Sequence, residues 1–529
     1  MLTKSDPDEI QSFLSDASHM RGGQAARVVF PENGEEVAEV LRAASERKTP
    51  VTISGAGTGT VGGRLPFAGI VLATDKLNQI KSVVHKEDAG RAVAEAGVRL
   101  ADLQRFVESE DLFYPPDPTE RSCFLGGTVA TNASGARTFK YGPTRNYVER
   151  LQIALATGDL IDLRRGELRA DPLGRIEIPL PSGRLFAAQL PTYRMPQTRK
   201  HASGYYVAPE MDVLDLFIGS EGTLGVIVEV EVALLPKPEG LLSGIVFFKT
   251  DESVLSFVRE ARELSLANRL ASGGEANRLG PLMEKALQVT DRCGSNPVQG
   301  DDQAVSLIDA RALEYFDSES LEFLRQKYET IPAEAQGAIF FEQETTRASE
   351  DAVMTDWLAL LERHLALIDD SWFATGEQDQ AKLREFRHAL PVLMNEWFAR
   401  HQQRKVSTDM SVPDEAFPDM LRNYQETLRA SELRYTIFGH IGDNHVHVNI
   451  LPRNDDEAAE ARAIYLEFLR RVAAVGGTLS AEHGVGKLKR DYLRLFFSDD
   501  NLREMAALKR ALDPAGILGR GNIFSEEYL

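Results

Sequence analysis

The 529-residue sequence is poor in cysteine and contains no long apolar run. Its two cysteines, Cys123 and Cys293, form no C-x-x-C pair, which excludes a zinc ribbon or an iron–sulfur cluster built from this chain alone. One disulfide could join them, but a reduced intracellular chain is the simpler interpretation. No stretch of about 18 apolar residues is present, so no membrane-spanning helix is expected. The acidic N-terminus lacks the features of a signal peptide, so we expect a cytoplasmic protein, with docking at the inner face of a membrane left open.

Positive charge is also in short supply. Lysine and arginine number 60 against 80 aspartate and glutamate residues, which gives a net charge of −20. Such a chain repels phosphate backbones, which argues against nucleic acid as a partner. An anionic small molecule would need a local cation, such as a metal ion or an arginine. The rest of the composition, 43% apolar and 26% charged, is typical of a globular protein, and the length allows two to four domains.

The hydrophobic pattern outlines several elements. Apolar residues recur at helical spacing in 31–50 and 456–475, which predicts two helices. Short strands are expected at 51–54 and 69–77, and further strands alternate with glycine turns up to a Pro-x-Pro stretch. That stretch places a domain boundary near residue 238.

The sequence SGAGTGTVGG follows the strand at 51–54 and concentrates glycine. Gly57, Gly59 and Gly62 superficially match the dinucleotide fingerprint, in which the last glycine opens a helix. No helical pattern follows Gly62, so the Rossmann interpretation fails on context. Two alternatives remain: a nest of backbone N–H groups that binds an anion, or a glycine-rich surface loop without a ligand.

Two further glycine-rich segments lie at 114–148 and 217–230. Glycines there indicate backbone that turns tightly or approaches something closely. Three such segments favour one long ligand wrapped by several loops, and the alternative is a loop-rich edge of a domain.

Histidine is concentrated near the C-terminus, where four of the ten histidines lie between residues 440 and 483. If HVHVN is a strand, His445 and His447 share one face of it. Glu482 and His483 follow in TLSAEHG, expected as a short strand and turn. Two imidazoles and a carboxylate would form a divalent-metal site, although any single histidine is more often structural.

Six motifs together resemble one family: GAGTGTVGG, DPTERSCFLGGTVATNASGARTFKYG, GSEGTLGVI, GHIGDNHVHVN, AEHGVGK and DPAGILGRGNIF. In this order they resemble the FAD-linked oxidases of the vanillyl-alcohol-oxidase/PCMH-type fold, especially the D-lactate, glycolate and D-2-hydroxyglutarate dehydrogenases. The resemblance implies an α+β fold: a two-lobed PCMH-type FAD-binding domain (1–238), an α+β, ferredoxin-like cap domain (239–480), and a C-terminal segment (481–529) that returns toward the flavin.

The resemblance also implies which residues bind FAD. The pyrophosphate loop has no histidine, and some relatives use one there to attach the flavin covalently, so noncovalent FAD is expected. The implied FAD-binding residues are Gly55, Gly57, Thr58, Gly59, Asp117, Thr119, Gly126, Gly127, Asn132, Gly135, Glu221, Gly222, Ile227 and Asn522. Asn522 stands where the family has a lysine, so a cation beside the flavin is expected to be missing.

By the same resemblance, His440, His447 and Glu482 hold one divalent metal, with Zn²⁺ or Mn²⁺ expected, and His483 is the general base. Asn444 and His445 depart from the family motif, where Gly and Asn are usual. Three roles stay open for His445: a spare ligand, a surface residue or a group behind the ligands.

A carboxylate contact is expected from LREFRHALP, which resembles an arginine-bearing helix start. Arg387 is the main candidate and Arg384 the alternative. Ser407 stands where the family often has a lysine that is suited to a second carboxylate, with Lys405 two residues earlier. This difference favours a monocarboxylate such as D-lactate.

The expected activity is therefore FAD- and metal-dependent oxidation of a D-2-hydroxy acid, D-lactate first, to the 2-oxo acid. The alternatives are D-2-hydroxyglutarate or glycolate as substrate, a metal-free FAD-linked alcohol oxidase, and a non-catalytic subunit of a flavoprotein complex. Electrons would leave to a quinone, a cytochrome, an electron-transfer flavoprotein or another subunit. A homo-oligomer is compatible with the sequence.

Overall fold

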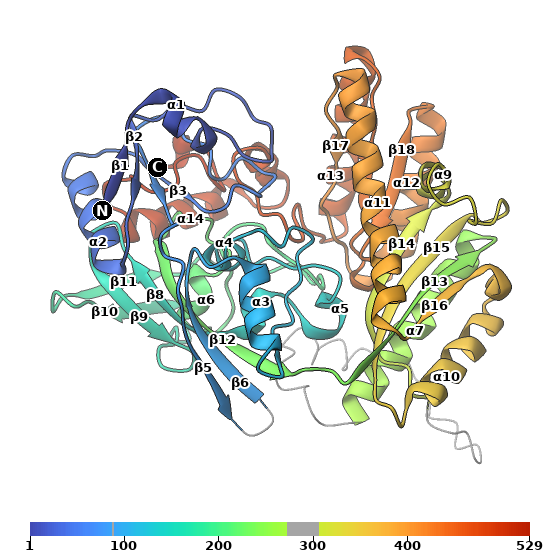
Figure 1. Ribbon diagram of the computed structural model, residues 1–529. Coiled ribbons are helices and arrows are strands. Elements are labelled where there is room, and N and C mark those ends of the chain that lie inside the picture. The colour runs from blue at the N-terminus through green and yellow to red at the C-terminus, as the bar shows by residue number, and fades with distance from the viewer. Residues whose placement is uncertain (87–88, 272–305) are drawn as a thin grey trace.

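The computed structural model describes residues 1–86, 89–271 and 306–529, and the chain forms two lobes (Figure 1). The first lobe holds a four-stranded and a six-stranded sheet together with the C-terminal residues, and the second holds a seven-stranded sheet. The mixture of sheets and helices confirms the predicted α+β class. None of the described helices is long and apolar enough to cross a membrane. Cys123 is a free, buried thiol, whereas Cys293 lies outside the described residues.

The four-stranded sheet carries the first glycine loop at one strand end. Its order is β1 (Leu2–Lys4), β2 (Arg27–Phe30), β4 (Ile70–Ala73), β3 (Val51–Ser54). Strand β3 runs parallel to β4 and ends directly before the loop. Helix α2 (Gly34–Glu46) packs its apolar stripe beside these strands in one core cluster. The helix and both strands expected here are confirmed: β3 has the expected bounds, and α2 and β4 are a few residues shorter than the pattern suggested.

The six-stranded sheet is organised around one long buried strand, β12. The order is β5 (Ile80–Lys86), β6 (Ala89–Glu95), β12 (Val226–Pro236), β8 (Val148–Ala154), β9 (Leu160–Arg164), and β7 (Leu112–Phe113) pairs the end of β12. A separate hairpin joins β10 (Arg175–Pro179) to β11 (Leu185–Gln189). The short helices of this lobe are α1 (Pro7–Ile10), α3 (Leu100–Glu108), α4 (Leu125–Ala130), α5 (Thr138–Tyr141) and α6 (Leu214–Phe217), within the described residues.

The seven-stranded sheet is antiparallel in every pairing. Its order is β16 (Trp372–Ala374), β13 (Gly240–Phe248), β15 (Gly337–Thr345), β14 (Ala310–Asp317), β18 (Tyr435–Gly439), β19 (His447–Ile450), β17 (Val406–Ser407). Among the described residues, the helices of this lobe are α7 (Asp251–Ala271), α9 (Ser318–Arg325), α10 (Glu350–Arg363), α11 (Glu377–His401), α12 (Phe417–Ser431) and α13 (Asp455–Ala474). The predicted helix at 456–475 corresponds to α13. Beyond Pro236 the chain leaves β12 and enters β13 of this second sheet.

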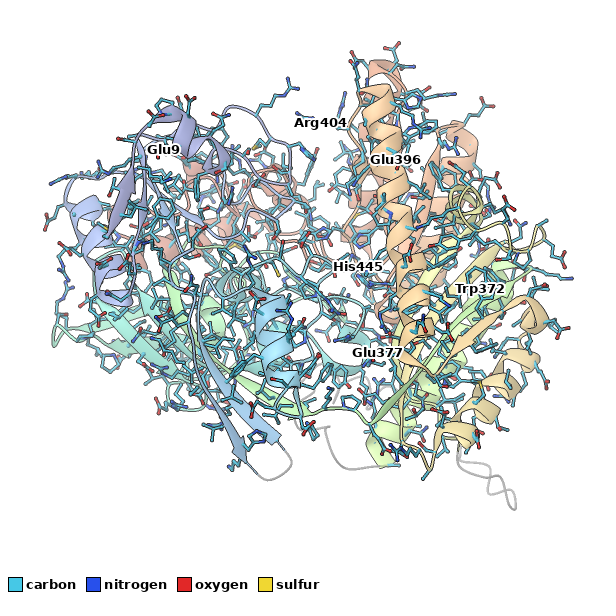
Figure 2. The ribbon with its side chains drawn as sticks, viewed as in Figure 1. Glu9, Trp372, Glu377, Glu396, Arg404 and His445 are labelled. Atoms are coloured by element: carbon cyan, nitrogen blue, oxygen red, sulfur yellow. The ribbon has the colours of Figure 1, made fainter. Side chains whose placement is uncertain are left out.

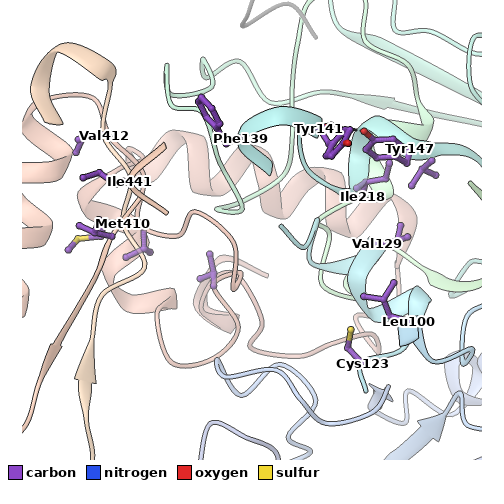
Figure 3. Close-up of a cluster of buried hydrophobic side chains, with 14 of the residues drawn as sticks. Leu100, Cys123, Val129, Phe139, Tyr141, Tyr147, Ile218, Met410, Val412 and Ile441 are labelled. Carbon is purple, nitrogen blue, oxygen red and sulfur yellow. Dashed lines mark hydrogen bonds between the residues drawn. The ribbon is translucent and has the colours of Figure 1, made fainter. Parts of the chain in front are cut away.

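The two lobes share one hydrophobic core. Buried side chains of the first lobe, such as Leu100 and Val129, belong to the same contiguous cluster as Met410 and Ile441 of the second (Figure 3). Burial of this much apolar surface is the main stabilising term in folding. The lobes are therefore packed as one unit, and residues at their junction are held from both sides.

The C-terminal residues return to the first lobe. Helix α14 (Asp499–Leu512) ends at Asp513, and Leu518 then forms a parallel bridge to Val51 of β3. Asp513 is fully buried and accepts hydrogen bonds from the N–H groups of Ile517 and Leu518. The end of the chain is thereby held beside the strand that leads into the first glycine loop.

Three local expectations were wrong. HVHVN does not form one strand, because β19 begins only at His447 and His445 makes a single bridge to Ser411. TLSAEHG contains no strand, and Thr478 makes only an isolated bridge to the same Ser411. Arg387 lies in the middle of α11 rather than at a helix start. In all three places, contacts with distant segments decide the conformation, and a local pattern does not contain them.

Candidate functional site

The first glycine loop, residues 55–63, presents its backbone rather than side chains. Within the described residues, the N–H groups of Gly57, Thr58 and Gly59 donate to no other protein group. A Cβ added at Gly59 would meet no atom within 4 Å. Arg64 holds the loop from one side, since its guanidinium donates to the carbonyl of Gly55 at 2.8 Å. Backbone N–H groups without a protein partner, on a loop that contacts the positive charge of Arg64, are suited to binding a phosphate group.

The second segment runs through the predicted residues Gly126, Gly127 and Asn132. Gly126 serves packing, because its N–H donates to Ala96 at 2.8 Å and an added Cβ would overlap Ala96. Gly127 is the opposite case, since no atom lies within 4 Å of an added Cβ. Asn132 adopts a positive φ of 50° and its Oδ1 accepts a hydrogen bond from the Arg145 N–H.

Asp117 and Gly135 lie against each other at the end of this segment. The carbonyl oxygen of Asp117 lies so near Gly135 that any Cβ there would overlap it. The Asp117 carboxylate pairs with Arg121 at 2.8 Å and with Arg137 at 3.4 Å, and these cations lower its pKa despite burial. Thr119 lies elsewhere, at the cavity described below.

The third segment is tied to the AEHGVGK motif by Glu221. This buried carboxylate accepts hydrogen bonds from the N–H groups of Val485 and Gly486, both at 2.7 Å, while burial raises its pKa to about 6. Gly222 packs against Ile53 of β3. Ile227 is a buried residue of β12, so its side chain contributes to the core.

Asn522 joins the first and third segments. Its amide donates to the carbonyl of Gly63 at 3.0 Å and to that of Glu221 at 3.1 Å. Its Oδ1 accepts a hydrogen bond from Lys487 Nζ at 2.6 Å, and Lys487 also donates to the Gly62 and Gly63 carbonyls. Lys487 therefore brings a cation to Asn522, which itself lacks the charge of the family's lysine; burial lowers the pKa of Lys487 to about 8. Nothing in the local sequence around Asn522 indicated this lysine.

These features fit an extended dinucleotide. FAD recognition needs N–H groups for the phosphates, open space beside the backbone and a cation. The loop at 55–63 offers the N–H groups, Gly59 and Gly127 leave open space, and Lys487 is the buried cation. Asn522, Glu221 and their partners bring the first and third glycine segments together in the folded chain.

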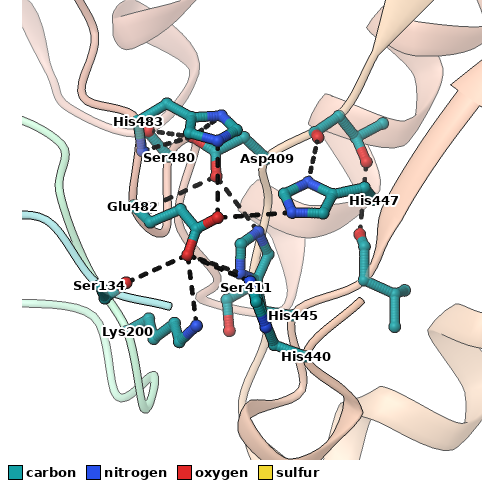
Figure 4. A network of polar contacts seen from close by, with 12 residues as sticks. Ser134, Lys200, Asp409, Ser411, His440, His445, His447, Ser480, Glu482 and His483 are labelled. Atoms are coloured by element: carbon teal, nitrogen blue, oxygen red, sulfur yellow. Dashed lines mark hydrogen bonds and ion pairs between the residues drawn. The ribbon is translucent and has the colours of Figure 1, made fainter. Parts of the chain in front are cut away.

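The predicted metal ligands gather around Glu482, at the side of the second lobe that faces the first (Figure 4). His440 follows β18, His447 begins β19, and Glu482 follows α13. His440 Nε2 lies 3.4 Å from Glu482 Oε2, and His447 Nε2 lies 3.4 Å from Glu482 Oε1. The three side chains predicted as ligands therefore converge, as a shared cation requires.

Each of the two histidines has a second partner on its other ring nitrogen. His440 Nδ1 lies 2.6 Å from Glu314 of β14, and His447 Nδ1 lies 3.1 Å from the Thr408 carbonyl. Metal-binding imidazoles in proteins characteristically hold such an outer partner, which fixes the ring orientation. Arg387 and His440 lower the pKa of Glu314 to about 2, despite its burial.

His445 joins the same group. It is fully buried, which excludes the surface role left open for it, and in the side-chain view it lies where the lobes face each other (Figure 2). A ligand atom from each of His440, His445, His447 and Glu482 lies within 4.8 Å of the others. Burial lowers the pKa of His445 to about 3, so its ring is neutral at physiological pH.

Asp409 holds the Glu482–His483 turn in place, a role that the sequence did not reveal. It accepts hydrogen bonds from the N–H groups of Glu482 and His483 at 3.3 and 3.1 Å. Lys489 Nζ lies 2.6 Å from the same carboxylate, and Ser480 also donates to it. The pKa of Asp409 lies well below its usual range because His483 and Lys489 outweigh burial.

A lysine from the first lobe also reaches Glu482. Lys200 is almost fully buried, and its Nζ lies 3.3 Å from Glu482, 3.4 Å from Asp443 and 3.0 Å from the Gly135 carbonyl. It connects the second glycine segment with the carboxylate of the cluster. The sequence offered no signal for it, because the partners are 65 to 282 residues away.

His483, the predicted base, lies beside the cluster. Its ring stacks on His447 with centroids 5.5 Å apart, and its Nδ1 lies 3.4 Å from Asp409. The side chain keeps 36% of its surface exposed, more than the ligands do. Desolvation outweighs the neighbouring carboxylates and lowers its pKa, so the imidazole is neutral and able to accept a proton.

Arg387 reaches the same region from α11. Its Nε donates to Glu314 at 3.0 Å, and the residue lines the cavity. Arg384 approaches Glu342 at 4.0 Å and does not line that cavity. Of the two candidates, Arg387 is thus the one placed beside the histidines.

The cavity has a volume of about 150 Å³ and is lined by the predicted metal ligands, the predicted base and Arg387. Its walls include Thr119 from the first lobe and Arg387, His388, Lys405 and Ser407 from the second. His440, His447, Glu482 and His483 also line it. A larger cavity of about 450 Å³ lies between α2 and the four-stranded sheet and contains none of the predicted site residues.

A known family model matches residues in each of the two lobes. Residues 25–164 match the FAD binding domain, and residues 303–523 match the C-terminal domain of FAD linked oxidases. Among solved structures, an alkyldihydroxyacetonephosphate synthase superposes with a TM-score of 0.62 at 15% identity, covering 98% of this chain and 81% of that one. At that identity the likeness concerns the fold alone.

Curated relatives match over nearly the whole chain. Identity is 30% to D-lactate dehydrogenase of Anaerostipes hadrus, over 98% of this chain and 93% of that protein. The sequence is 29% identical to glycolate oxidase subunit GlcD of Bacillus subtilis, over 94% of this chain and 89% of that protein. The sequence is 26% identical to D-2-hydroxyglutarate dehydrogenase of Stutzerimonas stutzeri, over 98% of this chain and 95% of that protein. The chain therefore belongs to the FAD-linked oxidases of the vanillyl-alcohol-oxidase/PCMH-type fold, in the family of the D-lactate, glycolate and D-2-hydroxyglutarate dehydrogenases.

Proposed function

We propose that the protein oxidises a D-2-hydroxy acid, with D-lactate favoured, to the 2-oxo acid, using noncovalent FAD and one divalent metal. One observation carries the proposal: a single cavity is lined by the neutral His483, the converging groups His440, His447 and Glu482, and Arg387. These are a base, a ligand set and a carboxylate-binding cation at one place. The D-lactate dehydrogenase relative supports the choice of first substrate.

His440, His447 and Glu482 would hold the metal, with Zn²⁺ or Mn²⁺ expected from two imidazoles and a carboxylate. When bound there, the metal supplies Lewis acidity that lowers the pKa of the substrate hydroxyl. Glu314 and the Thr408 carbonyl keep both imidazoles turned toward Glu482. The ligands thus need little rearrangement to bind a cation.

His483 would take the hydroxyl proton. Its lowered pKa leaves the ring unprotonated, and Asp409 fixes the turn that carries it. Bound FAD supplies the hydride acceptor, flavin N5. Thr119 comes from a predicted FAD-binding segment and lines the cavity, which supports placing this chemistry beside the flavin.

Arg387 would bind the substrate carboxylate. Its Nε is engaged by Glu314, which orients the guanidinium and leaves terminal N–H groups for a second carboxylate. On a chain with a net charge of −20, this cation and the metal together would draw in an anionic substrate.

Anaerobic reduction of the bound flavin tests this function. D-lactate should bleach the flavin absorbance while L-lactate does not, chelation should abolish bleaching, and Zn²⁺ or Mn²⁺ should restore it. Bleaching that survives chelation would favour a metal-free alcohol oxidase, and no bleaching by any D-2-hydroxy acid or glycolate would favour a non-catalytic subunit. The name of the GlcD relative, a subunit, motivates that last comparison. Acid precipitation should release the FAD, because the loop at 55–63 has no histidine.

A second substrate class is favoured by Lys405. This lysine lines the cavity and makes no ion pair or hydrogen bond with any described residue, whereas Arg387 is paired with Glu314. It therefore offers a cation to a second carboxylate, although Ser407 occupies the position where the family often has its lysine. D-2-hydroxyglutarate is the corresponding candidate, and such a relative matches the chain.

The two substrate classes are separated by the variant Lys405→Met. If the substrate is a dicarboxylate, kcat/KM for D-2-hydroxyglutarate should fall about 10-fold or more while kcat/KM for D-lactate stays unchanged. Arg404→Met, at the neighbouring residue that does not line the cavity, is the matched control. Equal kcat/KM values for wild type and Lys405→Met would leave D-lactate as the favoured substrate.

A further inference from the structure

His445 differs from an ordinary buried histidine in what surrounds its ring. The residue has no exposed surface, and its Nδ1 makes no hydrogen bond to any described group. Its Nε2 faces Asp409 Oδ1 at 3.1 Å, whereas its Nδ1 lies 3.9 Å from the nearest carboxylate oxygen, Glu482 Oε2. A buried polar atom without a partner is costly, so such a ring calls for another ligand.

The ring has the same two-sided environment as the two predicted ligands. His440 turns Nε2 to Glu482 and Nδ1 to Glu314, while His447 turns Nε2 to Glu482 and Nδ1 to the Thr408 carbonyl. His445 turns Nδ1 to Glu482 and Nε2 to Asp409. In each case one nitrogen points to the shared carboxylate and the other to an outer oxygen, the arrangement of metal-bound imidazoles.

The backbone explains how His445 reaches that position. Asn444 adopts a left-handed φ of 54°, and its side chain is held by Arg262 at 2.7 Å and Asp414 at 2.5 Å. The chain therefore reverses between His440 and His445, and the His445 N–H donates to the His440 carbonyl at 3.1 Å. The His445 ring lies with its centroid 5.3 Å from that of His440 and 4.6 Å from that of His447.

We propose that His445 is a further metal ligand, so that the cation is bound by three imidazoles and Glu482 instead of two imidazoles and Glu482. The inference rests on the proposed metal dependence and extends its ligand set. Three imidazole nitrogen donors favour Zn²⁺, Co²⁺ or Fe²⁺ over the oxygen-preferring Mg²⁺ and Ca²⁺. Two positions stay available to the substrate hydroxyl and carboxylate if the cation becomes six-coordinate.

Metal binding to the FAD-loaded full-length protein tests the ligand. After removal of metal with a chelator, Zn²⁺ affinity is measured by competition with a chromophoric chelator for wild type, His445→Asn and His364→Asn. His364 is the matched control because it also contacts a carboxylate, Glu260 at 2.7 Å, but lies between α7 and α10. His445→Asn should weaken Zn²⁺ binding at least about 10-fold, while His364→Asn leaves it unchanged.

A spectroscopic count of imidazoles separates a ligand from a merely structural residue. Echo-modulated EPR of the Cu²⁺-loaded protein should report one coordinated imidazole fewer in His445→Asn, with FAD content and thermal stability measured alongside. If His445→Asn fails to fold, the wild-type count decides alone: three imidazoles support the inference and two overturn it. Unchanged Zn²⁺ affinity and imidazole count would overturn the ligand while leaving metal dependence intact, whereas wild type without any Zn²⁺ binding would overturn both.

Discussion

The loop at residues 55–63 and the cluster around Glu482 offer different kinds of group to a ligand. The loop offers backbone N–H groups and glycine surfaces, with Arg64 behind it. The cluster offers side chains from separate strands and loops, and a second partner fixes the ring orientation of His440 and of His447. A backbone site needs only a short stretch of suitable residues, whereas a side-chain site needs a folded lobe around it. Substitutions in the cluster should therefore change chemistry or metal binding alone, and those in the glycine segments should change FAD binding or folding.

His483→Ala should have the largest effect. Flavin reduction by the hydroxy acid should fall about 10²–10⁴-fold, because a positioned base is lost, while FAD and metal contents stay at wild-type levels. Stopped-flow measurement of anaerobic flavin reduction checks this, with His364→Ala as the control. A normal reduction rate would contradict the role of His483 as the base.

Glu482→Gln should come next, since it removes the carboxylate on which the histidines converge. Metal affinity should fall about 10–100-fold or more with FAD retained. Elemental analysis and the flavin absorbance of the purified variant measure both contents. Metal at wild-type stoichiometry would show that Glu482 is not a ligand.

Two glycines of the second segment should respond differently. Gly135→Ala should destabilise the fold by about 1–3 kcal/mol, because the new Cβ overlaps the Asp117 carbonyl. Gly127→Ala should leave the FAD-free protein as stable as wild type, or more stable by up to about 1 kcal/mol, since Gly127 lies in α4 with open space beside it. It should still raise the Kd for FAD about 10-fold. Thermal melts with and without FAD distinguish the two effects, and the reverse pattern would contradict the assignment of Gly127 to the cofactor surface.

The effect of Glu221 should be visible only as a pH dependence. Burial raises its folded pKa to about 6 from an ordinary value of 4.5, so its contribution to stability is complete below pH 4.5 and is lost as the pH rises through 6. Between pH 4 and 7 the wild type should therefore lose about 2 kcal/mol of stability relative to Glu221→Gln. Denaturant titrations at both pH values provide the measurement, and parallel pH profiles would show that Glu221 is not the titrating group.

Much of the first lobe could be predicted from local pattern. The helix at α2, the strand at β3 and the glycine loop after it follow from short-range periodicity and from residues whose backbone is unusually free. The identities of His440, His447 and Glu482 came from the resemblance to a family, and the structure brings them together. Lys200, Lys487 and Asp409 were not predicted, because their partners are separated from them by dozens to hundreds of residues.

The sequence by itself determined the glycine path of the first lobe and the types of residue available for chemistry, since these depend on local composition, and the family resemblance carried by its motif order implied the α+β class. Only the tertiary structure decided which groups meet. It buried His445 beside Glu482, placed Arg387 in mid-helix against Glu314, and brought Lys487 to Asn522. Orientation of side chains depends on the packing of remote elements, and a linear pattern carries no information about that packing.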